Sequence, residues 1–548
     1  MTRPAKVIEQ TPLIPAQRLP IAKTYIEEIH LEFAKAGILI TSEIVIKADE
    51  IHLEITKDTI PMMAEKLNAW NFSLIQLTAT DERVLQGNFR LFYTFANDEK
   101  KLLLIVSIGV AETKPEFPSI TGIIPAAHWY EREIRDLFGL DPIGHPEIRR
   151  LAVHRDWPKK LYPLRKDFSL ASDVPRTDGQ FTFKNIEGEG VFQIPVGPIH
   201  AGIIEPGHFR FSAVGETVLN LEARFFYTHR AMEKLAEGKT PLEALLLAER
   251  ICGACSFSHA ASYCQAIEKL TGTEVSARVN FNRTAVLELE RLYNHVGDVG
   301  NICAGIGFAF GTMHGARLRE DIMRLNEIVF GSRFLRGIIT PGGLRRDISL
   351  ENSELILVSL AKLEQEFKEL VEILLGSDSY MNRVETTGIL TNQIARDLHA
   401  VGPAARASGI NRDTRRDHPY AAYDRVLFRV PVYQQGDVLA RVKVRIDETF
   451  ESINIIRQVL KSMPEGELCK SLGELPPYNY ALGITESARG ENAHFIMSGP
   501  NNTIYRYMVR SASHCNWQVV PSTVPGNIVP DFPLINKSFE LCYSCLDR

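Results

Sequence analysis

The sequence contains few cysteines and no apolar run long enough to cross a membrane. Eight cysteines in 548 residues are far too few for a disulfide scaffold. The longest strongly apolar run, Leu102 to Ala111, is about half the length of a membrane-spanning helix. The N-terminus also lacks a basic segment followed by an apolar one, so we expect a soluble, intracellular chain.

The sequence also lacks any large excess of charge. Its 62 Lys and Arg residues and 67 Asp and Glu residues give a formal net charge of -5. Such a small imbalance gives no reason to expect nucleic acid or an anionic membrane surface as the main partner. The composition, 45% hydrophobic and 24% charged, is typical of a globular protein with a large core.

Apolar residues divide the chain into two regions. Near the N-terminus they alternate with polar neighbours over 51–55 and 89–95, and the apolar run 102–110 predicts a buried strand. The segment Phe168 to Gln180, rich in Ser, Asp, Pro and Gly, predicts a domain boundary. We therefore expect an α+β N-terminal domain, residues 1–170, which contains no cysteine.

Helical patterns dominate the remainder, residues 171–548. Thr240, Pro241 and Glu243 predict a helix start with a capping box, and this helix would end at about Ile251, just before Cys252. A second pattern has the 3.5-residue period of a long helix packed at a shallow angle against another; its members are Ile356, Leu360, Leu363, Phe367, Leu370 and Leu374. We expect a mainly α-helical large domain built on a helical bundle with small β elements.

Two C-x-x-C pairs carry the clearest chemical signal. Cys252 and Cys255 lie in ERICGACSFSH, and Cys542 and Cys545 lie in ELCYSCLDR. Four thiolates can surround one soft cation, for which the default is a tetrahedral structural zinc; a nickel or iron centre, or a redox disulfide, is the alternative. The pairs are separated by about half of the chain, whereas zinc ribbons and knuckles close short loops. The spacing thus favours a site that organises a whole domain.

The remaining cysteines stand alone in the sequence. We interpret them as small buried apolar residues; they are Cys264, Cys303, Cys469 and Cys515.

The two cysteine motifs together resemble those of nickel-iron hydrogenase large subunits. Other segments resemble respiratory complex I: Pro125 to Arg150 and Leu161 to Asp167 are similar to its 30-kDa-type subunit. EPGHFRF, PGGLRRD and VGPAARASG are similar to its 49-kDa-type subunit. The chain thus resembles a fusion of the two subunits, and since complex I lacks the cysteine pairs, the resemblance is to hydrogenases of the formate-hydrogenlyase or hydrogenase-4 type.

The resemblance implies a nickel-iron centre whose iron carries carbon monoxide and cyanide. All four cysteines would bind nickel, and Cys255 and Cys545 would also bridge to iron. Arg489 would overhang the open nickel position and Ser522 would donate a hydrogen bond to a cyanide. Glu205 would pass protons to and from a nickel-bound thiolate, a task for a carboxylic acid with a raised pKa. His259 and His295 are candidate donors beside the centre.

The resemblance also implies a second metal, magnesium or iron, with Glu233 as a carboxylate ligand. The sequence departs from the family pattern at Arg548, where those enzymes carry a histidine ligand to this metal, and at Glu540 and Asn294, where many relatives carry other residues near the nickel. The second site is therefore expected to be empty or differently built.

Partners follow from the resemblance as well. No further cysteine motif could hold an iron-sulfur cluster. Electrons would therefore arrive through an iron-sulfur small subunit and ferredoxin-like subunits, and formate dehydrogenase is a further candidate. The assembly would sit on integral-membrane subunits at the cytoplasmic face of the cell membrane. Two other hypotheses stay open at this point: a zinc-stabilised structural subunit, and a quinone-site subunit that has gained cysteines.

Overall fold

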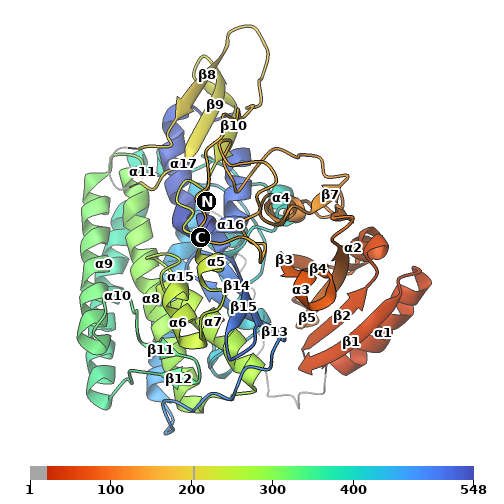
Figure 1. Ribbon diagram of the computed structural model, residues 1–548. Coiled ribbons are helices and arrows are strands. Elements are labelled where there is room, and N and C mark those ends of the chain that lie inside the picture. Colours follow the sequence, from red (N-terminus) through yellow and green to blue (C-terminus); the bar gives the residue numbers. More distant parts are fainter. Residues whose placement is uncertain (1–20, 48, 201–203) are drawn as a thin grey trace.

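The computed structural model describes residues 21–47, 49–200 and 204–548. An N-terminal sheet with flanking helices lies beside a larger, mainly helical region, and a small sheet projects from the top (Figure 1). The predicted fold class, α+β followed by a helical bundle with small β elements, is confirmed.

The N-terminal sheet has five strands in the order β1-β2-β5-β4-β3, with β2 and β5 parallel. Its strands and flanking helices are α1 (Ile21–Lys35), β1 (Ile40–Lys47), β2 (Glu50–Ile55), α2 (Ile60–Ala69), β3 (Ser73–Glu82), α3 (Arg83–Gln86), β4 (Asn88–Asn97), β5 (Leu102–Ala111), β6 (Glu116–Pro118), α4 (His128–Phe138) and β7 (Asp141–Ile143). The three strands predicted from sequence are confirmed as β2, β4 and β5.

Both faces of strands β2 to β5 are largely buried, which the alternation in the sequence does not reveal, whereas the described side chains of the edge strand β1 are mostly exposed. His52 stacks on Tyr480 with ring centroids 4.8 Å apart, and Phe92 meets Phe495 at 4.9 Å. These aromatic partners belong to a second sheet, β13 (Tyr480–Ser487), β14 (Gly490–Ser498) and β15 (Ile504–Arg510). Polar residues on β2 therefore face protein instead of water, and one hydrophobic core runs through both regions.

No helix or strand lies between β7 and β8 (Val191–Val196), and the predicted boundary at residues 168–180 falls within this stretch, all of which is described. Beyond it, β8, β9 (His208–Val214) and β10 (Thr217–Arg224) form the projecting sheet. That residues 1–170 and 171–548 are separate domains stays a prediction, because the two regions share a core.

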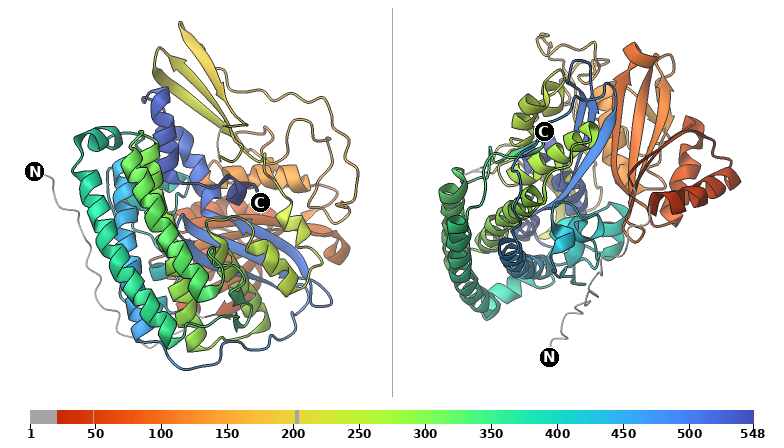
Figure 2. Two further views of the ribbon diagram at one scale, coloured as in Figure 1. Left: turned by 90° about the vertical axis from the view of Figure 1, so that its left-hand side faces the viewer. Right: turned by 90° about the horizontal axis from the view of Figure 1, so that it is seen from below.

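Four long helices form the bundle, seen at the side of the molecule in Figure 2: α8 (Ala277–Ala304), α9 (Ala309–Phe330), α10 (Leu350–Leu375) and α15 (Val438–Lys461). On α10 the buried residues are the six predicted from the 3.5-residue period. Stripes of this kind let neighbouring helices pack at shallow angles, and the predicted bundle is confirmed.

Helices α8 and α9 approach closely at two glycines. A Cβ on Gly300 of α8 would lie 2.8 Å from the Cα of Gly315 on α9, so no larger residue fits there without moving a backbone. This contact fixes the spacing of the two helices.

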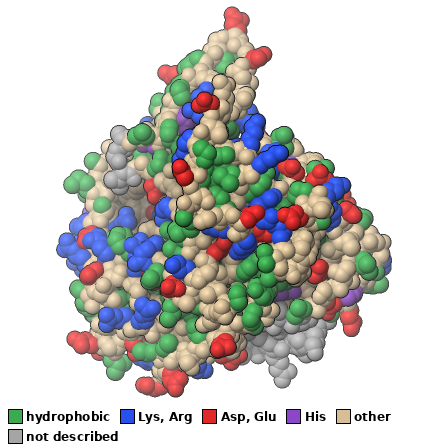
Figure 3. Space-filling view, in the orientation of Figure 1, with side chains coloured by type: hydrophobic (Ala, Val, Ile, Leu, Met, Phe, Trp, Pro, Cys, Tyr) green, Lys and Arg blue, Asp and Glu red, His purple; other side chains and the backbone are tan. Residues whose placement is uncertain are grey.

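The other elements are α5 (Met232–Leu235), α6 (Pro241–Ala248), α7 (Ser256–Thr271), β11 (Ile339–Thr340), β12 (Gly343–Leu344), α11 (Asp378–Val384), α12 (Asn392–Asp397), α13 (Gly402–Ala407), α14 (Thr414–Asp417), α16 (Ala512–Val519), α17 (Phe532–Phe539) and α18 (Tyr543–Asp547). No helix among the described residues is both long enough and apolar enough to span a membrane. Acidic and basic side chains occur side by side over much of the face drawn in Figure 3, in keeping with the small net charge.

The lone cysteines are buried with one exception. Cys264, Cys303 and Cys515 lie in the core, but Cys469 is exposed, so its interpretation as a buried residue was wrong. Cys469 pairs by backbone with Gly343 in an isolated bridge outside the named strands, where its side chain is left at the surface.

Candidate metal centre

The two cysteine pairs lie at the starts of helices. Helix α6 begins with the predicted capping box of Thr240 and Glu243, and after α6 ends, Cys252 and Cys255 follow, with Cys255 as the N-cap of α7. Cys542 is the N-cap of α18, and its sulfur accepts a hydrogen bond from the backbone N–H of Cys545 at 3.4 Å. In the same way, the sulfur of Cys252 accepts from the backbone N–H of Cys255 at 3.3 Å. Each pair thus forms a compact turn with both sulfurs close together.

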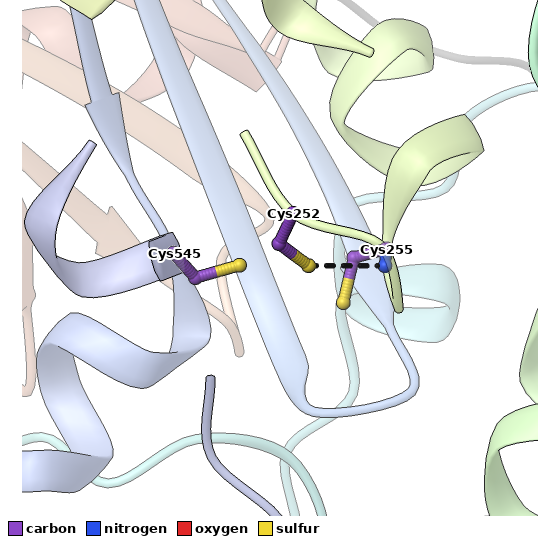
Figure 4. Close-up of side chains that lie close together, drawn as sticks. All are labelled: Cys252, Cys255 and Cys545. Atoms are coloured by element: carbon purple, nitrogen blue, oxygen red, sulfur yellow. Dashed lines mark hydrogen bonds between the residues drawn. The ribbon is translucent and has the colours of Figure 1, made fainter. Parts of the chain in front are cut away.

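The fold brings the distant pairs into one cluster. The sulfurs of Cys252, Cys255 and Cys545 lie within 4.8 Å of one another, and all three residues are buried. Figure 4 shows the Cys545 side chain pointing from the C-terminal segment toward the other two. Within residues 21–47, 49–200 and 204–548, no other group of three or more His, Cys, Asp or Glu side chains lies so close.

Electrostatics inside the cluster favour a bound cation. Hydrogen bonds from Cys252 and Cys545 lower the pKa of Cys255 to about 5, whereas the hydrogen bond with Cys252 raises the pKa of Cys542 to about 12. Cys542 is half-buried and lies outside the close group of three, whereas the other three cysteines are buried. Four neighbouring thiols of this kind cannot all ionise unless a cation balances their charge. This donor set, four soft sulfurs, therefore fits a nickel-iron centre bound as the resemblance implies.

Glu205 contacts Cys542, the fourth cysteine of the two pairs. Its Oε2 accepts a hydrogen bond from the thiol of Cys542 at 3.7 Å and from the backbone N–H of Ser544 at 2.9 Å. Burial, together with the neighbouring Cys542, raises the pKa of Glu205. A carboxyl group with a raised pKa next to a thiol has the chemistry that the predicted proton exchange needs, and this role stays a prediction.

Arg489 is buried beside the cysteines and held by a carboxylate that the sequence analysis missed. Its guanidinium donates to both oxygens of Asp298, one of them at 2.9 Å. Glu540 lies 4.0 Å away, and the amide oxygen of Asn294 accepts a weaker bond at 3.5 Å. Asp298 and Asn294 are one turn apart on α8, so their i,i+4 spacing was the available signal. Although burial alone would lower it, the negative charges of Asp298, Glu540 and Cys255 raise the pKa of Arg489.

His259 contacts the cluster and begins a chain of buried polar side chains. Its Nε2 lies 3.4 Å from the sulfur of Cys545, and its Nδ1 lies 2.9 Å from Nε2 of His494. His494 in turn lies 2.8 Å from the hydroxyl of Tyr507. Burial lowers the pKa of His259 to about 3, so both imidazoles are neutral at pH 7. No motif in the sequence points to His494, which lies on β14.

The structure gives Ser522 and His295 other partners. The Ser522 hydroxyl donates to the carbonyl of Val519 at 2.6 Å, so its predicted role toward a cyanide stays a prediction. His295 lies 2.8 Å from a carboxylate oxygen of Glu448 and 3.8 Å from Asp298. It therefore lies behind Asp298, in a buried network of charged side chains.

Glu233 does not offer free oxygens to a second metal. Its Oε2 accepts a hydrogen bond from Arg506 at 2.8 Å, and its Oε1 lies 3.1 Å from the guanidinium of Arg548 and accepts from the backbone N–H of Val509 at 3.2 Å. The residues present do not fit magnesium, which needs an octahedral set of oxygen ligands.

Comparisons with known proteins agree with this geometry. Family models match residues 53–174 as the 30 Kd subunit of respiratory-chain NADH dehydrogenase, 230–298 as nickel-dependent hydrogenase, and 305–475 and 470–548 as the 49 Kd subunit of respiratory-chain NADH dehydrogenase. Formate hydrogenlyase subunit 5 of Escherichia coli K12 is 38% identical over 91% of this chain and 89% of its own length. Hydrogenase-4 component G of the same organism is 38% identical over 91% of this chain and 87% of its own length.

A solved structure has a similar fold over about two thirds of the chain. A chain of the membrane-bound sulfane sulfur reductase, an archaeal respiratory membrane complex, aligns with a TM-score of 0.62 at 27% identity; the alignment covers 66% of this chain and 99% of that one. That protein is a sulfane sulfur reductase, so the fold by itself does not define the activity.

Fold and site together define a nickel-iron hydrogenase catalytic subunit built on two complex-I-like modules. The cysteine thiols that the two pairs bring together are the feature that distinguishes this class. The chain belongs to the large subunits of complex-I-related, group 4 nickel-iron hydrogenases, the type of formate hydrogenlyase and hydrogenase-4.

Proposed function

We propose that this hydrogenase works mainly toward proton reduction, in which two protons and two electrons combine to one molecule of dihydrogen. The observation that carries the proposed chemistry is the contact of Glu205 with Cys542, because it gives protons a route to and from a ligand thiolate. Such a route serves both directions of the reaction, and the similarity to formate hydrogenlyase subunit 5 supports proton reduction as the main one.

The chain's own residues would have separate roles in metal binding, charge stabilisation and proton transfer. When bound, the nickel-iron centre, its iron carrying carbon monoxide and cyanide, supplies the redox chemistry. Cys252, Cys255, Cys542 and Cys545 would hold it. Arg489, fixed by Asp298, would present a positive charge beside the thiolates, and Glu205 would deliver protons. Burial of Cys252, Cys255 and Cys545 would limit the access of bulk water to the centre.

Electrons would come from partner subunits. We expect an iron-sulfur small subunit, ferredoxin-like electron-transfer subunits and integral-membrane subunits of a complex-I-like arm, with formate dehydrogenase as a candidate source of electrons. This places the chain at the cytoplasmic face of the cell membrane, attached through its partners. The relation to a chain of an archaeal respiratory membrane complex supports such an assembly.

The N-terminal region would contribute docking and no redox chemistry, since residues 1–170 contain no cysteine. Crosslinking of the assembled complex followed by mass spectrometry tests this proposal. Partner peptides should be joined to residues 21–170, and a metal bound within this region would contradict it.

Metal analysis and gas measurements test the proposed function as a whole. The purified complex should contain nickel and iron at about one each per chain, and it should evolve dihydrogen from a low-potential reduced dye faster than it consumes dihydrogen with an oxidised one. Zinc alone, or neither metal, would contradict the metal centre. Faster consumption would reverse the proposed direction while leaving the centre intact.

A further inference from the structure

The side chain of Arg548 contacts Glu233, the residue predicted to bind a second metal. Arg548 is 2% exposed, and its guanidinium reaches three groups. One nitrogen lies 2.6 Å from Oε2 of Glu133, and the other donates to the carbonyl of Val509 at 2.7 Å and lies 3.1 Å from Oε1 of Glu233. The predicted carboxylate ligand thus has a guanidinium in contact with it.

Every carboxylate oxygen in this cluster already has a donor. Oε1 of Glu133 lies 2.9 Å from Nε2 of His514, and Oε2 faces Arg548. Arg506 and Arg548 take the two oxygens of Glu233. Two carboxylates face two guanidiniums in a buried space, so their charges balance without a metal. A divalent cation would lie against two fixed positive charges and raise the cost of burying the group.

We propose that Arg548 replaces the second metal of the family and positions the C-terminal cysteine pair by tying it to Glu133 of the N-terminal region. Arg548 is a positioning residue, because it touches neither the thiols nor the substrate. It directly follows α18, which has five residues and carries Cys545. Glu133 lies on α4, so the ion pair joins the first region of the chain to its last helix.

Geometry explains why arginine suits this task. A guanidinium presents several donors in a rigid fork, and here it meets carboxylates from two separate elements and one backbone carbonyl. A shorter imidazole would need a metal ion to bridge the same carboxylates. The backbone beside it is also held: the carboxylate of Asp547 accepts from the N–H groups of Phe226 and Thr228, each at 2.8 Å.

Metal analysis of the wild-type holocomplex gives the first test and needs no variant. We expect nickel and iron but less than about 0.1 magnesium per chain, with no further iron. Dialysis against EDTA should leave the hydrogen-exchange rates of the peptide covering residues 543–548 unchanged. One tightly held magnesium or additional iron per chain, or faster exchange of that peptide after EDTA, would overturn the replacement of the metal by Arg548.

A pair of variants on α4 tests the positioning role. Glu133→Gln removes the charge that faces Arg548 and leaves the C-terminal sequence intact. Exchange in the 543–548 peptide should rise at least ~10-fold, and nickel content should fall. The control is Glu131→Gln, since Glu131 is a buried carboxyl group on the same helix that binds Ser119, Thr121 and the backbone of Ile120 instead.

Two results would oppose the positioning role. Exchange in the 543–548 peptide could stay at the wild-type rate in Glu133→Gln, or rise equally in both variants. Glu133→Asp, which keeps the charge, should restore most of the protection, so failure of this rescue together with a rise in Glu131→Gln would indicate a general effect on α4.

Discussion

Glu205 and Cys542 are joined across 337 residues of sequence by a hydrogen bond of 3.7 Å from thiol to carboxylate. The backbone N–H of Ser544 holds the same carboxylate oxygen at 2.9 Å. The carboxyl group of Glu205 and the last cysteine pair are therefore positioned together, so that a change in one alters the surroundings of the other.

Substitution of Glu205 by Gln should remove the first proton relay. The amide keeps the shape and can still accept from Ser544, but it cannot cycle a proton. General acid–base groups are typically worth 10²–10⁴-fold, so we expect hydrogen evolution to fall at least ~100-fold with nickel content unchanged. Reductant should still change the metal spectra. Activity within a few-fold of wild type would move the route elsewhere, with His259 the next candidate.

Substitution of Cys542 by Ser should abolish nickel retention and hydrogen evolution together, because serine oxygen is a poor replacement for a soft thiolate. Cys469→Ser is the matched control, since Cys469 is exposed and outside the cluster. Nickel and iron content with gas evolution are the measurements. Full activity of Cys542→Ser would remove this residue from the ligand set.

Substitution of Asp298 by Asn should loosen Arg489 without removing a metal ligand. Arg489 would lose its nearest charged partner and keep Glu540 at 4.0 Å and the amide oxygen of Asn294 at 3.5 Å. Since small misplacements of a catalytic group can cost up to about 100-fold, we expect turnover to fall by roughly 10-fold to 100-fold at constant nickel content. Asp321→Asn, at an exposed ion pair on α9, should have no effect. Equal activities would show that Arg489 needs no such support.

Acid stability should depend on Glu50, which links the N-terminal sheet to α7. Glu50 lies 2.6 Å from Lys269. Burial alone would raise its pKa, but Lys269 and His52 lower it to about 2. The unfolded chain has a glutamate pKa of ~4.3, so the pair contributes roughly 3 kcal/mol above about pH 5, and this is lost as the pH falls toward 2.

Denaturant unfolding of the wild type and of Glu50→Gln between pH 3 and 7 measures this contribution. The variant should be less stable at pH 7 and should lose less stability on acidification. Glu112→Gln, at an exposed ion pair with Arg83, is the control. Parallel pH curves for the wild type and Glu50→Gln would show that Glu50 is not the titrating group.

The sequence predicted those features that depend on local pattern. The helix start at Thr240, the stripe of α10 and the strands β2, β4 and β5 all follow from spacing or caps within one element. The cysteines and Glu205 could be placed because motifs carry them. Asp298 and His494 could not, because each enters the site only through the packing of distant segments, and a single charged or aromatic residue has no signature of its own.

The burial of polar residues in the N-terminal sheet could not be predicted from the sequence for a similar reason. Alternation of apolar and polar residues over 51–55 is typical of a strand with one solvent-exposed face. Glu50 and His52 are nevertheless buried against the second region. Likewise, the sequence showed that Arg548 departs from the family pattern. Its pairing with Glu133 could not be predicted, because this contact joins two distant parts of the chain.

The glycine contact between α8 and α9 also bears on reactivity. Gly300 lies two residues after Asp298 on α8. The distance between α8 and α9 therefore affects the position of the Asp298 carboxylate, which binds Arg489. One added methyl group at Gly315 on α9 would press against the turn of α8 that contains Gly300. A substitution at this position, far from any ligand, would thereby change the rate of turnover. Comparisons of natural variants would then find adaptive changes in helix packing as well as among the catalytic residues.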